Sequence, residues 1–226
     1  MANVHAVLSK MKKIFILLSI FLILLILINS CPIVTQWDRS LIVFVQQKLS
    51  HIPLVIPMLP DCILYSIMIA LPLIGFGIFF IKKNLYADLV CLFSVPLVTF
   101  LLNCVIKPIV KRPRPPMELQ ITSIHPDSFS FVSSHSLVTI CLWGMVVWYL
   151  HKYCADKRLK LLGSIIAISW ILFVGLSRIW IGVHNPTDVL GAYVLGLLLI
   201  SIYIPRTKVV EKLLIEILLK TVKIFT

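Results

Sequence analysis

Acidic residues are scarce in this chain of 226 residues, where nine Asp and Glu stand against 21 Lys and Arg. Charged residues make up only 13% of the sequence, whereas 60% is hydrophobic and the mean hydropathy is +1.04. This balance excludes a soluble domain of ordinary composition, because such domains carry about 25% charged residues. Low-complexity linkers and internal repeats are also lacking. We therefore expect a single integral membrane domain over residues 1–226.

Metal-binding cysteine patterns are absent as well. The six cysteines follow no zinc-ligand spacing; they are Cys31, Cys62, Cys91, Cys104, Cys141 and Cys154. Most of them fall within apolar runs or at their ends, where a free thiol behaves as a small hydrophobic group. Cys31 and Cys62 are expected near the same membrane surface, which leaves a disulfide between them open.

The net charge of +12 would suggest nucleic-acid binding in a soluble protein. Here the cations flank apolar runs, so anionic lipid headgroups are the expected partners and nucleic acid is not. The sequence predicts no obligate protein partner.

Six stretches contain at most one charged residue, and each is close to the roughly 20 residues that cross a hydrocarbon core as a helix. These stretches are 14–37, 62–81, 88–106, 128–151, 161–177 and 189–205. They predict an all-α fold, a bundle of six transmembrane helices with amphipathic interfacial helices. The first stretch follows three lysines and resembles a secretion or lipoprotein signal, but its length and the lack of a good cleavage site favour a retained anchor.

Two further segments have the pattern of interfacial helices. In residues 35–52, Trp37, Phe44 and their apolar neighbours fall on one face, and Thr35 with Asp38 resembles a capping box at the helix start. The tail after Arg206 has an apolar stripe and i,i+4 pairs of Lys and Glu. It is expected on the cytoplasmic leaflet, with a frayed tail as the alternative.

Lys and Arg are distributed unequally between the two expected membrane sides. Six spans place both termini on one side, which then holds 14 Lys and Arg against seven on the other. The positive-inside rule makes the terminal side cytoplasmic. Three clusters of polar residues all fall on the opposite, extracytoplasmic side, at one level of the bilayer. The expected location is a bacterial inner or cell membrane.

The first cluster contains Lys107 and Arg114, which are separated by a proline-rich segment. Prolines favour an extended, stiff conformation that can hold both cations toward one point. The guanidinium plane suits phosphate, and lysine adds a point charge. The alternative is a basic loop that binds lipid headgroups.

The second cluster is Ser133, Ser134 and His135, at the start of the fourth span. Ser133 is a typical N-cap residue, and a helix N-terminus binds anions through its free N–H groups. Taken alone, this cluster is better explained as a capping serine beside an interfacial histidine.

The third cluster contains Arg178, His184 and Asp188. Asn185 and Pro186 predict a helix start, so Asp188 falls in the first turn, where a carboxylate stabilises any helix. If the helical turn extends back to His184, its imidazole and the Asp188 carboxylate face the same way. Asp188 would then accept the Nδ1 proton and leave Nε2 free to attack, as in a catalytic triad.

These residues resemble the three-part signature of the type 2 phosphatidic acid phosphatase superfamily. The matching residues are Lys107–x6–Arg114–Pro115, Ser133–x–His135 and Ser177–Arg178–x5–His184–x3–Asp188. The family includes membrane lipid phosphatases, undecaprenyl diphosphate phosphatases and soluble vanadium haloperoxidases.

The resemblance implies a role for each matching residue. His184 would form a phosphohistidine, Asp188 would orient it, and His135 would protonate the leaving oxygen. The phosphate oxygens would be held by Lys107, Arg114, Ser133, the backbone at Ser134, and Arg178. It implies no metal and no other cofactor.

The middle motif departs from the family pattern Pro-Ser-Gly-His at Val132 and Ser134. If the glycine position requires a positive φ, serine there costs about 1 kcal/mol or more of strain. Reduced activity, changed selectivity or an inactive relative are then the possible outcomes.

The sequence favours a membrane lipid phosphate or diphosphate phosphatase. A phosphotransferase that uses the same intermediate stays open, as does a non-catalytic lipid-binding or transport protein. His135, His184 and Asp188 could also form a metal site, although the neighbouring Lys and Arg would repel a cation. Undecaprenyl diphosphate, phosphatidylglycerol phosphate, phosphatidic acid and lipid A all remain candidate substrates.

Overall fold

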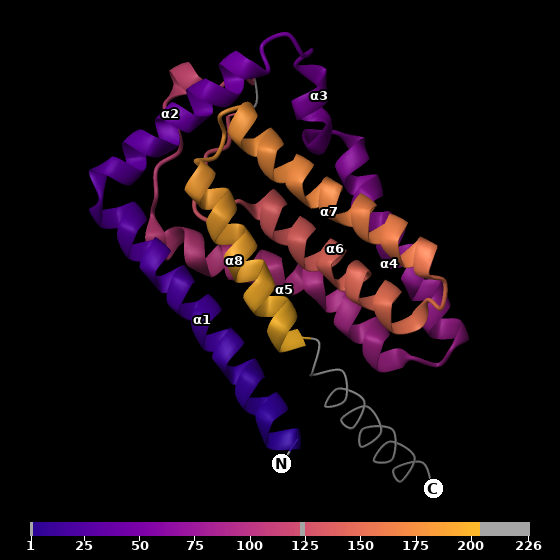
Figure 1. The fold of residues 1–226 in the computed structure, drawn as a ribbon. Coiled ribbons are helices and arrows are strands. Elements are labelled where there is room, and N and C mark those ends of the chain that lie inside the picture. Colours follow the sequence, from indigo (N-terminus) through magenta and orange to yellow (C-terminus); the bar gives the residue numbers. More distant parts are fainter. Residues whose placement is uncertain (1, 123–124, 204–226) are drawn as a thin grey trace, which may run out of the picture.

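The computed structural model describes residues 2–122 and 125–203, and the described part contains helices and no strand. Six of the helices are long, in agreement with the predicted all-α bundle (Figure 1). In chain order the elements are α1 Ala2–Ser30, α2 Pro32–Lys48, α3 Val55–Met58, the 3₁₀ turn η1 Leu59–Asp61, α4 Ile63–Lys82, α5 Tyr86–Val110, the 3₁₀ turn η2 Met117–Leu119, α6 Ser134–Tyr153, α7 Lys157–Trp180 and α8 Pro186–Tyr203.

Helix α6 lies at the centre of the bundle and packs against α4, α5, α7 and α8. Half of its residues are buried, including Leu137, Met145 and Tyr149. Tyr149 also belongs to an aromatic cluster, since its ring lies 4.7 Å from that of Phe80 in α4. This central helix also begins with the second polar cluster, so the core of the bundle fixes one part of the site.

Five helices in the described residues are long and apolar enough to cross a membrane: α1, α4, α5, α7 and α8. These correspond to five of the six predicted stretches. The sixth, 128–151, contains α6, which starts later and includes polar residues such as Ser136 and Thr139. Because α6 is enclosed by its neighbours, its polar groups face protein, and the surrounding helices carry the more apolar outer surface.

The predicted first stretch, 14–37, is not a single helix. Helix α1 ends at Ser30, and Pro32 begins α2. Proline is favoured in a first helical turn but cannot continue a preceding helix, so the chain changes direction there. Helix α1 packs against α8. All six cysteines are free, so the structure contains no Cys31–Cys62 disulfide.

Helix α2 replaces the interfacial helix expected at 35–52, and it starts at Pro32 with Cys31 as its N-cap rather than at Thr35. Its apolar residues Trp37 and Phe44 point outward, with 52% and 53% of their surface exposed. The opposite face is buried through Ile42 and Asp38. The capping-box interpretation of Asp38 was therefore wrong, because this carboxylate turns into the protein.

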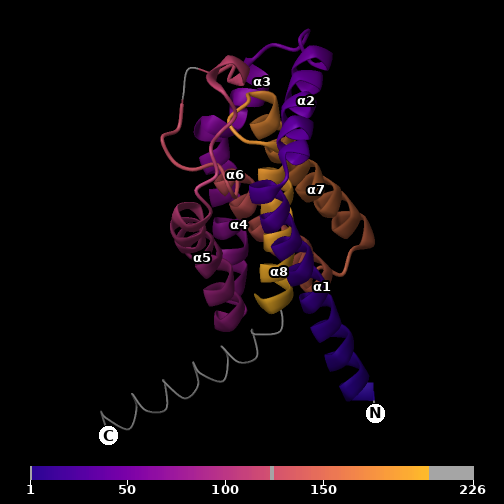
Figure 2. The ribbon, with the colours of Figure 1, turned by 90° about the vertical axis from the view of Figure 1, so that its left-hand side faces the viewer.

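The three clusters lie at one end of the bundle. Helix α5 ends near Lys107, α6 begins beside His135, and α8 begins at Pro186 (Figures 1 and 2). The opposite end holds the lysine-rich start of α7 and the pair of Lys152 with the buried Asp88, whose Nζ–Oδ2 distance is 3.0 Å. The N-terminal end of α1 and the C-terminal end of α8 also lie there (Figure 1). The tail after Arg206 lies outside the described residues.

Candidate active site

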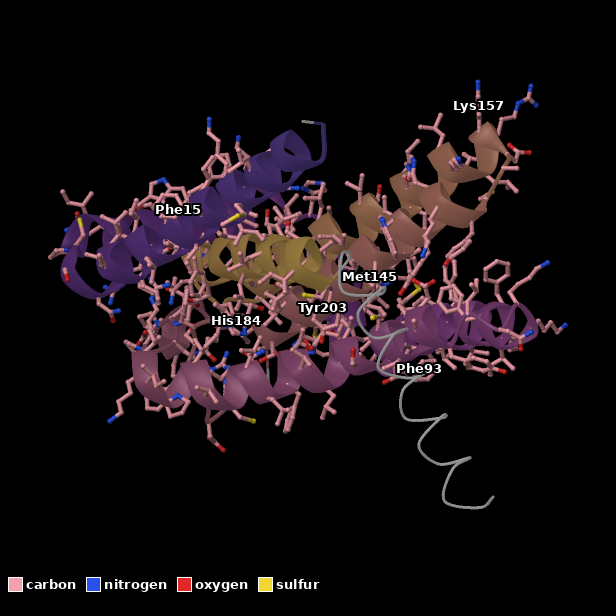
Figure 3. The ribbon with its side chains drawn as sticks, turned by 90° about the horizontal axis from the view of Figure 1, so that it is seen from below. Phe15, Phe93, Met145, Lys157, His184 and Tyr203 are labelled. Atoms are coloured by element: carbon pink, nitrogen blue, oxygen red, sulfur yellow. The ribbon has the colours of Figure 1, made fainter. Side chains whose placement is uncertain are left out.

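His184 lies inside the bundle in the short turn between α7 and α8, and only 4% of its surface is exposed. Figure 3 places it far from Lys157, which begins α7 at the other end of the molecule. The turn depends on Gly182, whose φ is +75° and whose Cα lies against Leu119: an added Cβ would be 1.9 Å from the Leu119 carbonyl oxygen. Only glycine fits this position. The backbone N–H of His184 donates to the Arg178 carbonyl at 3.3 Å, which closes the turn.

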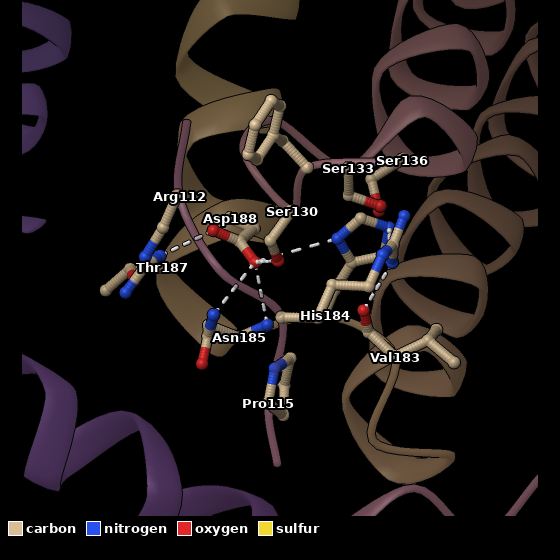
Figure 4. Close-up of polar contacts among 12 residues, drawn as sticks. Arg112, Pro115, Ser130, Ser133, Ser136, Val183, His184, Asn185, Thr187 and Asp188 are labelled. Atoms are coloured by element: carbon tan, nitrogen blue, oxygen red, sulfur yellow. Dashed lines mark hydrogen bonds and ion pairs between the residues drawn. The ribbon is translucent and has the colours of Figure 1, made fainter. Parts of the chain in front are cut away.

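Asp188 is fully buried in the first turn of α8, and its carboxylate faces four residues (Figure 4). Its Oδ2 accepts from the backbone N–H of Asn185 at 2.8 Å and from the Ser130 hydroxyl. Its Oδ1 accepts from Arg112 Nη1 at 2.5 Å. The bond to Asn185 stabilises the helix start, as expected for an acid at this position. The same carboxylate also faces His184, so it serves the helix and the site together.

The separation of His184 Nδ1 and Asp188 Oδ2 is 3.6 Å (Figure 4). This is the range of an ion pair and longer than a hydrogen bond, and Nδ1 has no hydrogen-bond partner within the described residues. Helix α8 begins at Pro186, so the helical turn does not extend back to His184 as the sequence suggested. The turn around Gly182 brings the two side chains together instead.

The protonation state of His184 follows from its burial. Burial lowers the pKa of the imidazole to about 4, against the opposing effect of Asp188, and Arg114 and Lys107 lower it further. The ring is therefore neutral at pH 7. Its Nε2 lies 3.4 Å from Arg114 Nη1, so the nitrogen that can attack faces a cation.

Lys107 and Arg114 converge on the segment that precedes α6. Lys107 Nζ donates to the Phe129 carbonyl at 2.6 Å. Arg114 Nε donates to the Ser128 carbonyl at 2.8 Å, and its Nη1 donates to the Val183 carbonyl at 2.6 Å. The structure thus brings the first cluster to His184 of the third, with the two cations held by backbone carbonyls and not by carboxylates.

The second cluster begins α6 as predicted, with Ser133 at the N-cap position. The Ser133 side chain makes no capping bond and instead accepts a hydrogen bond from Ser136 at 3.0 Å. Its backbone N–H donates to the Asp188 carbonyl at 3.3 Å, which ties the starts of α6 and α8 together. Ser134 is the first helical residue and does not have a positive φ. The glycine of the family pattern is therefore not needed here for backbone conformation.

Arg178 and His135 share a partner that the sequence analysis did not find. Asp61 Oδ1 accepts from Arg178 Nη1 at 2.5 Å and lies 3.9 Å from His135 Nε2. Arg178 is almost fully buried, whereas 35% of the His135 side chain is exposed. Each of the two histidines therefore has a carboxylate neighbour, Asp188 for His184 and Asp61 for His135.

Arg112, which the sequence did not single out, joins Asp188 to Asp38 in α2. Arg112 Nη2 donates to Asp38 Oδ2 at 2.6 Å, while its Nη1 donates to Asp188, so one guanidinium bridges two buried carboxylates. Asp38 also accepts from the Thr187 backbone N–H at 3.0 Å. Two signals were present in the sequence: two further cations, Lys111 and Arg112, lie between Lys107 and Arg114, and Asp38 is the one acidic residue in 32–48.

The described residues contain no group of three or more His, Cys, Asp or Glu side chains arranged to hold a metal ion. The Asp188 carboxylate of the metal alternative is already bonded to Arg112 and Ser130. Metal independence itself stays a prediction.

These contacts place a buried neutral imidazole beside a carboxylate, a helix start and a cluster of cations, which suits phosphoryl chemistry. The family model described as "PAP2 superfamily" matches residues 88–209, more than half of the chain. The chain belongs to the PAP2 superfamily.

Three curated proteins resemble parts of the chain. Phosphatidylglycerophosphatase B of Bacillus subtilis (strain 168) is 37% identical over 129 residues, which are 56% of this chain and 61% of that protein. Lipid phosphate phosphatase delta of Arabidopsis thaliana is 25% identical over 114 residues, 46% of this chain and 27% of that protein. Sphingosine-1-phosphate phosphatase 1 of Mus musculus is 26% identical over 117 residues, 51% and 26% respectively. Each match spans less than two thirds of the relative's length.

A crystal structure described as the first transmembrane PAP2 type phosphatidylglycerolphosphate phosphatase from Bacillus subtilis has a similar fold. The TM-score is 0.70 with 28% sequence identity, over 87% of this chain and 96% of that chain. Together with the five apolar helices, this similarity identifies the chain as an integral membrane protein.

Proposed function

We propose that this protein is a lipid phosphatase that removes a phosphomonoester or terminal phosphate at the extracytoplasmic membrane surface through a phosphohistidine. One observation carries the proposal: the buried, neutral His184 has Asp188 at its Nδ1 and Arg114 at its Nε2. A nucleophile needs a free electron pair, and the adjacent cation attracts the phosphate that it attacks. The curated relatives named above are lipid phosphatases, which supports this assignment.

The reaction would have two steps. In the first, the electron pair of His184 Nε2 forms the N–P bond, the bond from phosphorus to the ester oxygen breaks, and His135 gives that oxygen a proton. In the second, His135 takes a proton from water, the water oxygen bonds to phosphorus, and the N–P bond breaks with its electron pair returning to His184, which releases inorganic phosphate. Asp188 stabilises the cationic His184 that forms between the two steps.

The cations would hold the equatorial oxygens of the transferred group. Lys107, Arg114 and Arg178 carry three positive charges, and each charge-assisted hydrogen bond contributes about 1.5–3 kcal/mol. The N-termini of α6 and α8 add backbone N–H groups and partial positive charge. Contacts that strengthen as charge develops on phosphorus lower the barrier most.

Phosphatidylglycerol phosphate is the first substrate to test, because the relative with 37% identity is named a phosphatidylglycerophosphatase. A cavity of about 460 Å³ adjoins the site and could hold a polar headgroup. Its lining includes Arg114, Gln120, His125 and Ser128. Phosphatidic acid, undecaprenyl diphosphate and lipid A complete the substrate panel.

The test is phosphate release by purified protein, in detergent, from each lipid of this panel. His184→Ala should abolish release, whereas His151→Ala should retain it, because His151 is exposed at the other end of the bundle and bonds only Ser164 among the described residues. Rapid quenching with labelled substrate should trap a phosphoenzyme that is stable in base and labile in acid, and His184→Ala should not form it. Hydrolysis by His184→Ala at the wild-type rate would end the proposal.

The same assay separates the alternatives. Labelled phosphate recovered on an added lipid or sugar acceptor, in place of inorganic phosphate, would identify a phosphotransferase. Substrate binding without phosphate release would identify a lipid-binding or transport protein. Activity that survives an excess of a chelator would support metal independence.

A further inference from the structure

Asp61 occupies the last position of the 3₁₀ turn η1, two residues before the start of α4, and its side chain is 18% exposed. One of its oxygens, Oδ1, contacts two residues of the site. Arg178 Nη1 donates to it at 2.5 Å, and His135 Nε2 lies 3.9 Å away. Asp61 therefore connects the cation of the third cluster to the histidine of the second.

The imidazole of His135 is also held from a second direction. The ring of Tyr65 lies 4.6 Å from it, tilted by 49°, and the Tyr65 hydroxyl donates to the His135 carbonyl at 3.1 Å. Tyr65 follows Asp61 by four residues, so one short segment contacts the ring through both side chains. Because 35% of the His135 side chain remains exposed, part of the ring stays open to a substrate.

Burial of the His135 ring opposes its protonation most, and most of the charges that face the ring oppose it further. The charges of Arg178, Lys107 and His184 repel the His135 imidazolium, whereas the Asp61 carboxylate attracts it. The Tyr65 ring is the remaining titratable group in contact with it. A histidine that must carry a proton among these cations requires a nearby anion.

We propose that Asp61 is a positioning residue that keeps His135 oriented and protonated for transfer to the leaving oxygen; this inference rests on the proposed phosphatase function. The free protein has Arg178 bonded to Asp61. A bound phosphate dianion offers Arg178 competing acceptors, which leaves more of the Asp61 charge for His135. Substrate binding would thereby favour the imidazolium at the moment when it is needed.

Proton transfer to the leaving oxygen predicts a dependence on the leaving group. An alkoxide is a poor leaving group and needs the proton of His135, whereas a nitrophenolate leaves without one. General acid catalysis contributes about 10²–10⁴-fold to rates. Loss of Asp61 should therefore slow the hydrolysis of lipid alkyl phosphates and spare a nitrophenyl phosphate that carries an alkyl chain.

The experiment compares wild type, Asp61→Asn, Asp61→Glu and His135→Ala on phosphatidic acid and on this aryl phosphate. Asp61→Asn should lower kcat for phosphatidic acid about 10²-fold and change kcat for the aryl ester less than about threefold. The basic limb of its pH profile should move to lower pH, and Asp61→Glu should recover part of the rate. His135→Ala should slow both substrates, because His135 also takes the proton from water in the second step. Asp156→Asn is the matched control, because Asp156 caps α7 at the other end and asparagine also caps helices.

An equal loss with both substrates, or no loss with either, would overturn the role of Asp61. Failure of the wild type to release phosphate from any substrate would instead overturn the proposed function, so the two failures are distinguishable. Thermal unfolding of each variant identifies a folding defect. If Asp61→Asn does not fold, Asp61→Glu provides the same test, because displacing the carboxylate by one methylene should slow only the alkyl ester.

Discussion

At the residue scale, the proposed mechanism requires one neutral histidine and one protonated histidine within the same pocket. Burial disfavours a positive charge on both rings, although 35% of the His135 side chain is exposed and His184 is almost fully buried. Each imidazole has its own carboxylate, Asp188 or Asp61, on a different helix start. Pairs of titratable groups in contrasting environments are a common basis for acid and base roles.

The pKa of His184 yields a prediction for the pH dependence of activity. Burial lowers this pKa from 6.5 to about 4, so Nε2 remains free to attack down to that pH. The acid limb of kcat/KM should accordingly fall near pH 4 and not near 6.5. Phosphate release measured across this range checks it, and a limb at 6.5 would contradict it.

The same shift also affects stability, which supplies the control. A histidine whose pKa is lower in the folded state than in the unfolded state binds fewer protons when folded, so its contribution to folding is present above 6.5 and is lost as the pH falls toward 4. Thermal unfolding measured at each pH shows whether activity is lost because His184 becomes protonated or because the protein unfolds.

At the scale of elements, the turn between α7 and α8 determines where the nucleophile lies. Gly182→Ala forces a positive φ on alanine and places its Cβ against the Leu119 carbonyl. We expect a destabilisation of about 1–3 kcal/mol and a loss of phosphate release, because His184 must shift. Gly75→Ala is the control: its Cβ would meet nothing within 4 Å, and alanine in a helix is favoured over glycine. Similar unfolding midpoints for both variants would contradict this account.

Helix α2 makes the second prediction at this scale. Asp38→Ala leaves Arg112 with one carboxylate in place of two in a buried environment. Removing one partner of a buried ion pair costs about 3–5 kcal/mol, so unfolding in detergent should occur at a clearly lower temperature. The neighbouring Arg39→Ala should have little effect, because Arg39 is exposed. Equal effects of the two substitutions would show that Asp38 is not an anchor.

Helices whose length is set by the lipid surroundings could be predicted from the sequence, whereas contacts between distant segments could not. Helices such as α5 and α8 could be predicted because their apolar length reflects the lipid surroundings, and the residues of the three clusters could be grouped because alternating spans share an end. The residues that were missed, Asp38, Asp61 and Arg112, depend on contacts between segments more than 70 residues apart. No local periodicity encodes such pairs, and Asp38 in particular looked like an ordinary helix-start residue.

At the scale of the whole molecule, the distribution of lysine and arginine predicts which end faces the cytoplasm. The end with Lys152 and the start of α7 is expected inside, and the site is expected outside. Two native cysteines report on this directly, since Cys62 precedes α4 at the site end and Cys154 follows α6 at the other. In single-cysteine variants, a membrane-impermeant maleimide should label Cys62 in intact cells and Cys154 only after permeabilisation. The reverse pattern would invert the predicted topology.

The bridge from Asp38 through Arg112 to Asp188 has a consequence for how the protein is made. Asp38 comes from the first fifth of the chain and Asp188 from the last, yet they share one guanidinium. During translation, a nascent chain that ends with α7 lacks both this bridge and His184. Under the proposed function, a ribosome must therefore have synthesised nearly the whole polypeptide before any of it can cleave a phosphate, and products truncated before α8 would be inert in the bilayer.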